Sequence, residues 1–187
     1  MMRAGWRRSV LPGLRGDVLD LGAGTGAALP HLTATRSVSC VEPRPSRALR
    51  TAADRYGARL DAARAESLPY EDDSFDVAIC SAVLCSVSDQ DTALRELHRV
   101  LRPGGSVTFF EHIASAPGTW SRRAQRLIAP FSRVLDGGCD PARDTIEALQ
   151  RSPFKITRLD REVVRGLFGF ETVLISGRVV AEQPVPR

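Results

Sequence analysis

One short stretch decides the fold: Asp17-Val-Leu-Asp-Leu-Gly-Ala-Gly-Thr-Gly26. Its first half is an apolar run of strand length, and three glycines at every second position follow at once. Glycine has no Cβ, so the backbone can turn sharply after the strand and come close to a ligand. In open parallel sheets, ligands bind beyond the carboxyl ends of the strands. The stretch therefore predicts a first strand, a cofactor-binding loop and then a helix from Ala27 to Leu32.

The rest of the chain supports an α/β fold, because short apolar runs alternate with amphipathic stretches. Ser46 and Ser88 are placed to cap two helices, and Arg102-Pro-Gly-Gly105 is expected to stop the second. Further strands are predicted at 37–41, 59–63, 74–80 and 106–112. A single domain spanning 1–187 is expected, with its core at 16–112.

The alternation of short apolar runs and amphipathic stretches ends after residue 112. Residues 113–152 predict two helical segments around a turn at 136–141, and such an excursion from a rigid scaffold is typical of a functional segment. Within 153–180, the runs 155–159 and 170–180 are predicted to pair as closing antiparallel strands.

Composition excludes several classes. The net charge is +4, but the arginines are dispersed and aromatic residues make up only 6%, so nucleic-acid binding is not expected. No apolar run is long enough to span a membrane, and no secretory signal follows the basic start, so we expect a cytoplasmic protein. The four cysteines form no CxxC pair and accompany no paired histidines, so no metal site is expected.

Two carboxylates narrow the choice of cofactor. Dinucleotide folds usually carry GxGxxG and hold a pyrophosphate, whereas this loop is GxGxG and follows Asp20. A carboxylate there repels a pyrophosphate but suits a sulfonium cofactor with an amino-acid tail. Glu42, at the end of the second strand, can accept hydrogen bonds from two ribose hydroxyls. A nicotinamide-dependent reductase is the alternative reading of the same loop.

Four motifs in order resemble those of the class I S-adenosylmethionine-dependent methyltransferases. They are Asp20–Gly26, Glu42, Ala65-Glu-Ser-Leu-Pro69 before Ser74-Phe-Asp76, and Leu101-Arg-Pro-Gly-Gly105. The resemblance implies a Rossmann-like, seven-stranded, mainly parallel sheet with an antiparallel last strand and helices on both faces. It also implies S-adenosylmethionine as methyl donor and S-adenosylhomocysteine as product.

A narrower set of motifs is similar to the methyltransferase-like 7 proteins, which are alkyl-thiol methyltransferases. The set comprises Val83-Leu-Cys-Ser-Val87, Phe110-Glu-His-Ile113, Thr119-Trp120, Asp136-Gly-Gly-Cys139 and Arg143. This similarity implies a small-molecule acceptor, with a thiol favoured. Methylation of oxygen, nitrogen or carbon, or a non-catalytic cofactor-binding partner subunit, are the alternatives.

The resemblance and the loop together predict the site residues. Cofactor contacts are expected at Asp20, Gly22, Ala23, Gly24, Gly26, Glu42, Ala65, Glu66, Cys80 and Ser81, and acceptor contacts at Cys85, Trp120, Asp136, Cys139 and Arg143. The chain departs from the pattern at Arg64, where many relatives carry an acidic residue. It also lacks a match to the relatives' N-terminal cover and membrane anchor. We therefore expect either an open site or one covered by 113–152 or by the second subunit of a homodimer.

Methyl transfer from a sulfonium is an in-line displacement, so positioning supplies much of the acceleration. A free thiol has a pKa of about 8.5, so a base is needed to raise its thiolate fraction near neutral pH. His112 is the candidate base because it ends the fifth strand, although a structural role in the turn is the alternative. Glu111 is the second catalytic candidate, and since it alternates with His112, one of the two should point away from the pocket. Asp136, Cys139 and Arg143 either shape the acceptor pocket or only build the turn.

Overall fold

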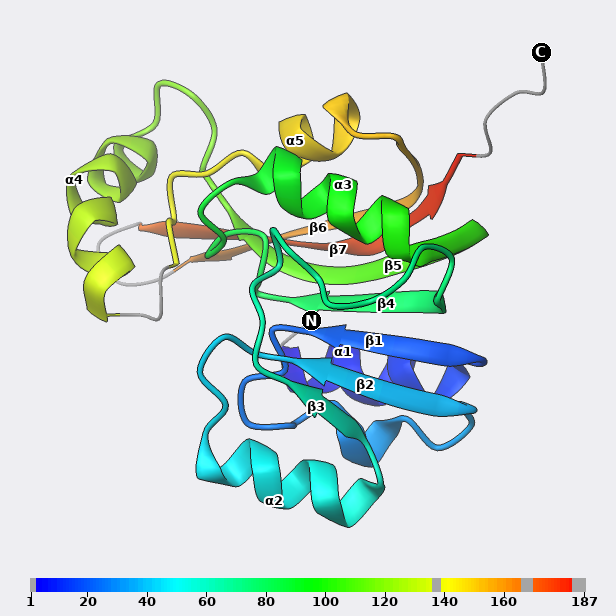
Figure 1. Cartoon of the computed structure of the whole chain (residues 1–187). Helices are drawn as coiled ribbons and strands as arrows, with labels where there is room; N and C mark the ends of the chain where they lie inside the picture. The colour runs from blue at the N-terminus through cyan, green and yellow to red at the C-terminus, as the bar shows by residue number, and fades with distance from the viewer. Residues whose placement is uncertain (1–2, 136–138, 166–169, 183–187) are drawn as a thin grey trace.

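A computed structural model describes residues 3–135, 139–165 and 170–182. Within them lies one seven-stranded sheet in the order β3-β2-β1-β4-β5-β7-β6 (Figure 1). Its strands are β1 Asp17–Leu21, β2 Ser37–Val41, β3 Arg59–Asp61, β4 Phe75–Ser81, β5 Leu101–Ile113, β6 Phe154–Arg165 and β7 Glu171–Ala181. β1 to β5 pair in parallel, whereas β7 runs antiparallel to both β5 and β6. The predicted mainly parallel sheet with an antiparallel last strand is confirmed.

Helices cover both faces of the sheet. They are α1 Arg3–Val10, α2 Arg47–Tyr56, α3 Gln90–Val100 and α5 Thr145–Arg151, whereas α4 Trp120–Leu135 lies beyond the end of β5 (Figure 1). Short 3-10 helices form at Leu11–Gly13 and Leu29–His31. Trp6 of α1 and Leu49 of α2 share one apolar cluster, whereas Leu97 of α3 and Leu149 of α5 belong to the other. Figure 1 shows α3 and α5 side by side on one face, with α2 on the opposite side. Side chains of β4 alternate between the two clusters, as expected of a strand that is buried on both faces.

The helix predicted from Ala27 to Leu32 is wrong, since only the 3-10 helix Leu29–His31 forms there. The N–H of Leu29 donates to the Gly26 carbonyl at 3.1 Å, and the N–H of His31 donates to that of Ala28 at 2.9 Å. Pro30 has no N–H to continue an α-helical ladder, and β2 begins only six residues after His31. The chain therefore takes tight i→i+3 turns instead.

The second predicted cap is also corrected. Asp89, and not Ser88, caps α3, because its Oδ1 accepts from the N–H groups of Asp91 at 2.9 Å and Thr92 at 3.2 Å. The Ser88 hydroxyl instead accepts from Arg64 at 2.6 Å. Ser46, by contrast, caps α2 as predicted, accepting from the N–H of Leu49 at 3.1 Å.

The motif Arg102–Gly105 lies inside β5 and not in a loop before it. α3 ends at Val100, and β5 begins at the next residue. Leu101 pairs with Phe75 and Ser106 with Val77, so the Pro-Gly-Gly stretch forms an irregularity in the parallel ladder. The motif ends the helix as expected, but by turning the chain directly into the strand.

The helix α1 has no counterpart among the sequence predictions. Its Trp6 is 1% exposed and packs with its ring centroid 5.7 Å from that of Phe110 on β5. The helix thereby brings Arg7 toward the end of β1. None of the described helices combines the length and the apolar character needed to cross a membrane.

Candidate active site

A cavity of about 780 Å³ opens beyond the carboxyl ends of β1, β2 and β4. Its walls come from four stretches of the chain: Leu21 and Gly22, residues 41–44, residues 62–66, and the loop that follows β4, through Ala82, Val83, Ser86 and Val87. This is the edge at which the glycine loop predicts a ligand.

The glycine loop is fixed against β2. The N–H groups of Gly22 and Ala23 both donate to the carbonyl of Val41, at 2.8 and 3.1 Å. Gly22 has a φ of +65°, and a Cβ at this position would lie 2.5 Å from Cγ2 of Val83. Gly22 therefore lets the loop after β4 approach the first strand and close one side of the cavity.

The predicted cofactor contacts divide between the cavity and the core. Gly22, Glu42, Ala65 and Glu66 line the cavity. Ala23 and Cys80 are buried in the apolar clusters, and a Cβ on Gly26 would lie 2.8 Å from that of Ala52 on α2. Gly26 thus serves helix packing. The Ser81 hydroxyl is buried and has no hydrogen-bond partner among the described residues.

Glu42 joins the glycine loop to the cavity wall. Its Oε2 accepts a hydrogen bond from the N–H of Gly24 at 3.2 Å, and its own N–H donates to the carbonyl of Asp61 at 3.2 Å. The carboxylate is therefore held at the rim between β1 and β2, where the sequence predicts ribose hydroxyls.

Asp20 is only 3% exposed, at the end of β1. Burial, together with the negative charge of Glu42, raises the pKa of this carboxyl to about 7, although the charge of Arg7 acts against the shift. Within the described part of the chain, neither Oδ2 of Asp20 nor Nε of Arg7 has a hydrogen-bond partner. A buried carboxylate oxygen without a partner needs a hydrogen-bond donor, and a positively charged donor forms the strongest bond with it.

Glu66 and Arg64 fasten two loops together. Glu66 Oε1 accepts from the N–H groups of Ser88 at 2.6 Å and Asp89 at 3.3 Å, and Arg64 lies 3.7 Å from the same carboxylate. These contacts hold the segment before β4 against the start of α3. Arg64, the departure from the family pattern, thus has a structural partner here.

Glu111 is a positioning residue in this structure. The side chain is fully buried, and its oxygens accept hydrogen bonds from the N–H groups of Val83 at 2.8 Å, Leu84 at 3.0 Å and Cys85 at 3.3 Å. Burial raises the pKa of this carboxyl well above its usual range, and the three N–H groups oppose the shift. Glu111 therefore fixes the loop after β4 and does not face the cavity.

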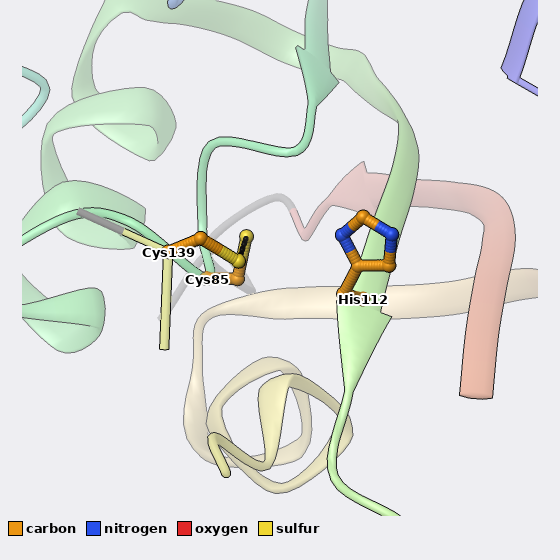
Figure 2. Close-up of side chains that lie close together, drawn as sticks. All are labelled: Cys85, His112 and Cys139. Carbon is orange, nitrogen blue, oxygen red and sulfur yellow. Dashed lines mark hydrogen bonds between the residues drawn. The ribbon is translucent and has the colours of Figure 1, made fainter. Parts of the chain in front are cut away.

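His112, near the end of β5, lies together with Cys85 and Cys139 (Figure 2). One ring nitrogen of His112 and the two sulfur atoms all lie within 4.8 Å of one another, and the Cys139 thiol donates to Sγ of Cys85 at 3.5 Å. This hydrogen bond and burial raise the pKa of Cys85 to about 12. The sequence predicted no metal-ligand set, because the three residues come from three segments 27 positions apart.

Residues 139–151 pack onto the loop after β4. The N–H of Asp140 donates to the carbonyl of Cys85 at 2.9 Å, and the N–H of Ala114 donates to that of Arg143 at 2.9 Å. The Arg143 side chain reaches the carbonyl of Leu84 at 3.5 Å. Two of the predicted acceptor residues, Cys139 and Arg143, are thus placed beside Cys85.

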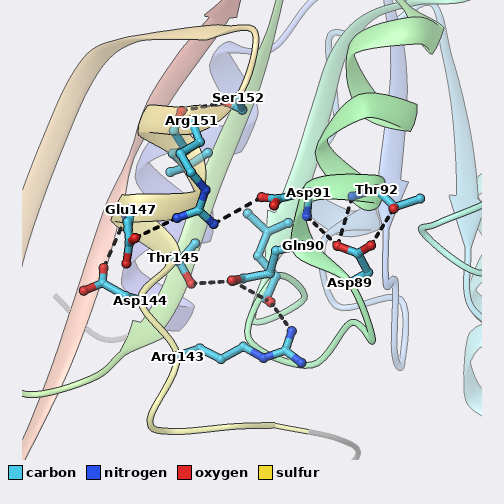
Figure 3. Close-up of polar contacts among 12 residues, drawn as sticks. Asp89, Gln90, Asp91, Thr92, Arg143, Asp144, Thr145, Glu147, Arg151 and Ser152 are labelled. Atoms are coloured by element: carbon cyan, nitrogen blue, oxygen red, sulfur yellow. Dashed lines mark hydrogen bonds and ion pairs between the residues drawn. The ribbon is translucent and has the colours of Figure 1, made fainter.

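Contacts between the start of α3 and both ends of α5 complete this packing (Figure 3). Nε2 of Gln90 donates to the carbonyl of Leu84 at 3.0 Å and to Thr145 at 3.1 Å, while Arg151 pairs with Asp91 at 3.3 Å. The predicted acceptor residue Trp120 is 60% exposed at the start of α4, and Asp136 lies outside the described residues.

Comparisons with known proteins give a consistent result. Residues 19–109 match a family model described as a methyltransferase domain. Two human proteins, thiol S-methyltransferases TMT1A and TMT1B, are each 34% identical, over 76% and 81% of this chain and 62% and 66% of their own lengths. The chain thus spans just under two thirds of those relatives.

Solved structures agree on the fold. The crystal structure of the YcgJ protein from Bacillus subtilis superposes with a TM-score of 0.76 at 18% identity, covering 97% of this chain and 99% of that one. A methyltransferase-like structure from Bacillus halodurans gives 0.75 at 14% identity, over 96% and 99%.

Proposed function

We propose that this chain, whose residues 19–109 match a methyltransferase domain, transfers the methyl group of S-adenosylmethionine to the thiol of a small molecule. One observation carries the proposal: the cofactor cavity and the Cys85–His112–Cys139 cluster share the loop that follows β4. Similarity to proteins named thiol S-methyltransferases over most of this chain supports the choice of acceptor. Cytoplasmic location and a homodimer stay predictions.

Residues that line the cavity, together with Asp20 just before its first lining residue, fit S-adenosylmethionine. Asp20 has a buried oxygen in need of a donor, which the cofactor's ammonium group can supply. Glu42 can accept hydrogen bonds from ribose hydroxyls. Ala63 and Ala65 offer a small, apolar wall to a flat base. When bound, the cofactor supplies an electrophilic methyl group on a positively charged sulfur.

The chain's own residues position the acceptor and exclude water. Glu111 holds the loop after β4 through three hydrogen bonds, so Val83 and Val87 form a fixed apolar wall of the cavity. An apolar wall favours reaction between a thiolate and a sulfonium, because their opposite charges cancel along the reaction coordinate. His112, at the end of β5, is the side chain that promotes loss of the acceptor's proton.

The test is incubation of the purified chain with methyl-labelled cofactor and a panel of thiols, phenols and amines. We expect labelled products, identified by mass spectrometry, from thiols alone. Labelling of phenols or amines in place of thiols would overturn the choice of acceptor. Cofactor binding without labelling of any compound would instead support the non-catalytic alternative. Glu42→Ala should weaken cofactor binding, and the exposed Glu71→Ala is its matched control.

A further inference from the structure

We propose that Cys85, His112 and Cys139 bind a thiophilic divalent cation, zinc by preference, and that an open coordination position of this ion takes the acceptor thiol. The part concerning the acceptor rests on the proposed function. The metal site itself stands on the geometry of the three side chains.

The ligand set is that of zinc. The donors are two sulfur atoms and one imidazole nitrogen. Zinc binds such soft and borderline donors, whereas magnesium and calcium prefer oxygen ligands. Zinc binds sulfur at about 2.3 Å and histidine nitrogen at about 2.0 Å, so the ligand atoms of a tetrahedral site lie ~3.3–3.8 Å apart. The sulfur atoms of Cys85 and Cys139 are 3.5 Å apart, which already matches this spacing. The largest separation between ligand atoms in the cluster is at most 4.8 Å. Rotation of the side chains that moves these atoms by about 1 Å would bring all three to the spacing of a tetrahedral site.

The backbone holds the three ligands in place. The N–H of Cys85 donates to Glu111, the residue before His112, at 3.3 Å. The carbonyl of Cys85 accepts from Asp140, the residue after Cys139, at 2.9 Å. The segments that carry His112 and Cys139 are therefore each tied to Cys85 through a residue adjacent to a ligand, which is the kind of support that a metal site needs around its ligands.

The described residues supply three ligands, which is the number typical of catalytic zinc sites that keep one position open. Cys85 is buried, whereas His112 and Cys139 are partly exposed, so the open position can be reached from solvent. Sγ of Cys85 also lies 3.6 Å from Oγ of Ser86, which lines the cofactor cavity. A thiol held by the ion would therefore lie close to the methyl donor.

The ion would replace a base. A thiol that coordinates zinc loses its proton to solvent and is bound as the thiolate. One electron pair of that sulfur forms the new bond to the methyl carbon, while the electrons of the breaking sulfonium C–S bond stay on the sulfur of the product S-adenosylhomocysteine. The thioether product is neutral and a weaker ligand, so it leaves and reopens the position. His112 then acts as a ligand that holds the ion.

The test measures metal before activity. We expect the protein, purified under reducing conditions without chelators, to contain one zinc per chain by elemental mass spectrometry. Cys85→Ser, His112→Ala and Cys139→Ser should each lower zinc affinity at least about tenfold. Cys40→Ala and His31→Ala are the matched controls, since neither residue belongs to the cluster, and they should keep the metal.

A variant that fails to fold would also lose metal, so the wild-type protein provides an independent measurement. Cobalt added to the zinc-free chain should give intense visible bands of tetrahedral geometry and a near-ultraviolet band of thiolate-to-cobalt charge transfer. Absence of these bands would overturn the site, as would a Cys85–Cys139 disulfide in place of bound metal. Thiol methylation by zinc-free protein in the presence of a chelator would overturn the role of the ion in binding the acceptor, but would leave the proposed function intact. Bound zinc without methyl transfer would do the reverse, supporting the metal site and contradicting the function.

Discussion

The carboxylate of Glu111 accepts a hydrogen bond from the N–H of Val83 at 2.8 Å, and this links the end of β5 to the wall of the cofactor cavity. Val83 also restricts position 22 of the glycine loop to glycine, because its side chain fills the space that a Cβ there would need. One buried carboxyl therefore sets the position of the loop on which both the cavity and the acceptor cluster depend.

Glu111→Leu should destabilise the fold strongly. The change leaves three buried N–H groups without an acceptor, and each unsatisfied group costs about 1–3 kcal/mol. We expect a loss of about 3 kcal/mol or more in the free energy of unfolding, measured by denaturant titration. Glu111→Gln keeps one acceptor oxygen and should lose less. Glu147→Leu, on the exposed side of α5, is the control. An unchanged midpoint for Glu111→Leu would refute the role of the carboxyl in holding the loop.

Gly22→Ala should abolish cofactor binding, because the new Cβ would lie 2.5 Å from Val83. Gly57 offers a matched control: its φ is also +65°, but a Cβ there would meet nothing within 4 Å. Both alanine variants carry the left-handed backbone cost of about 1–2 kcal/mol. Only Gly22→Ala should reduce affinity for S-adenosylmethionine in calorimetry. Equal affinities in the two variants would show that Val83 can move aside.

Local sequence signals predicted the frame of this site. The β1 run, the glycine loop, the cap at Ser46 and the position of Glu42 all depend on neighbours in the chain, and all are found as expected. The role of Gly26 could not be assigned in the same way, because its contact with Ala52 exists only after α2 has packed.

Long-range contacts explain what the sequence did not reveal. α1 is held by Trp6 against Phe110, more than a hundred positions away, and its own composition is strongly basic. Cys85, His112 and Cys139 meet only because three distant segments lie side by side: the loop after β4, the end of β5 and residues 139–143. Neither spacing nor periodicity in one stretch carries that information.

Asp20→Asn should raise stability while weakening cofactor binding. The folded-state pKa of Asp20 is raised to about 7, above the value of 3.8 expected for an unfolded chain. The folded state therefore holds the proton more tightly, so wild-type stability falls as pH rises from about 4 to 7 and the penalty is complete above 7. The asparagine variant lacks this penalty. Denaturant titrations at pH 5 and pH 8 should show a stability gain for the variant that is larger at pH 8.

The same group predicts a pH dependence of cofactor binding. A cationic partner favours the ionised carboxyl, so affinity for S-adenosylmethionine should rise with pH up to about 7 and then level off. Below that value, the dissociation constant should increase by up to about tenfold for each pH unit. Calorimetry on the wild type would show this slope, and Asp20→Asn should bind weakly with no slope. A wild-type affinity that does not change with pH would mean that Asp20 does not contact the cofactor.

His112→Ala should lower turnover without changing cofactor affinity, because His112 lies in the acceptor cluster and is not among the residues that line the cofactor cavity. Loss of a group that assists proton removal typically costs about 10²–10⁴ in rate. We expect kcat with thiol acceptors to fall in that range, while the dissociation constant for S-adenosylmethionine stays within about twofold of the wild type, a difference below 0.5 kcal/mol. His31→Ala, on the short helix after the glycine loop, should retain wild-type kcat. An acceptor that is already fully ionised at neutral pH should lose less activity than an ordinary thiol, since it needs no help in losing its proton. Equal losses for both acceptors would indicate that His112 shapes the site and does not act on the acceptor proton.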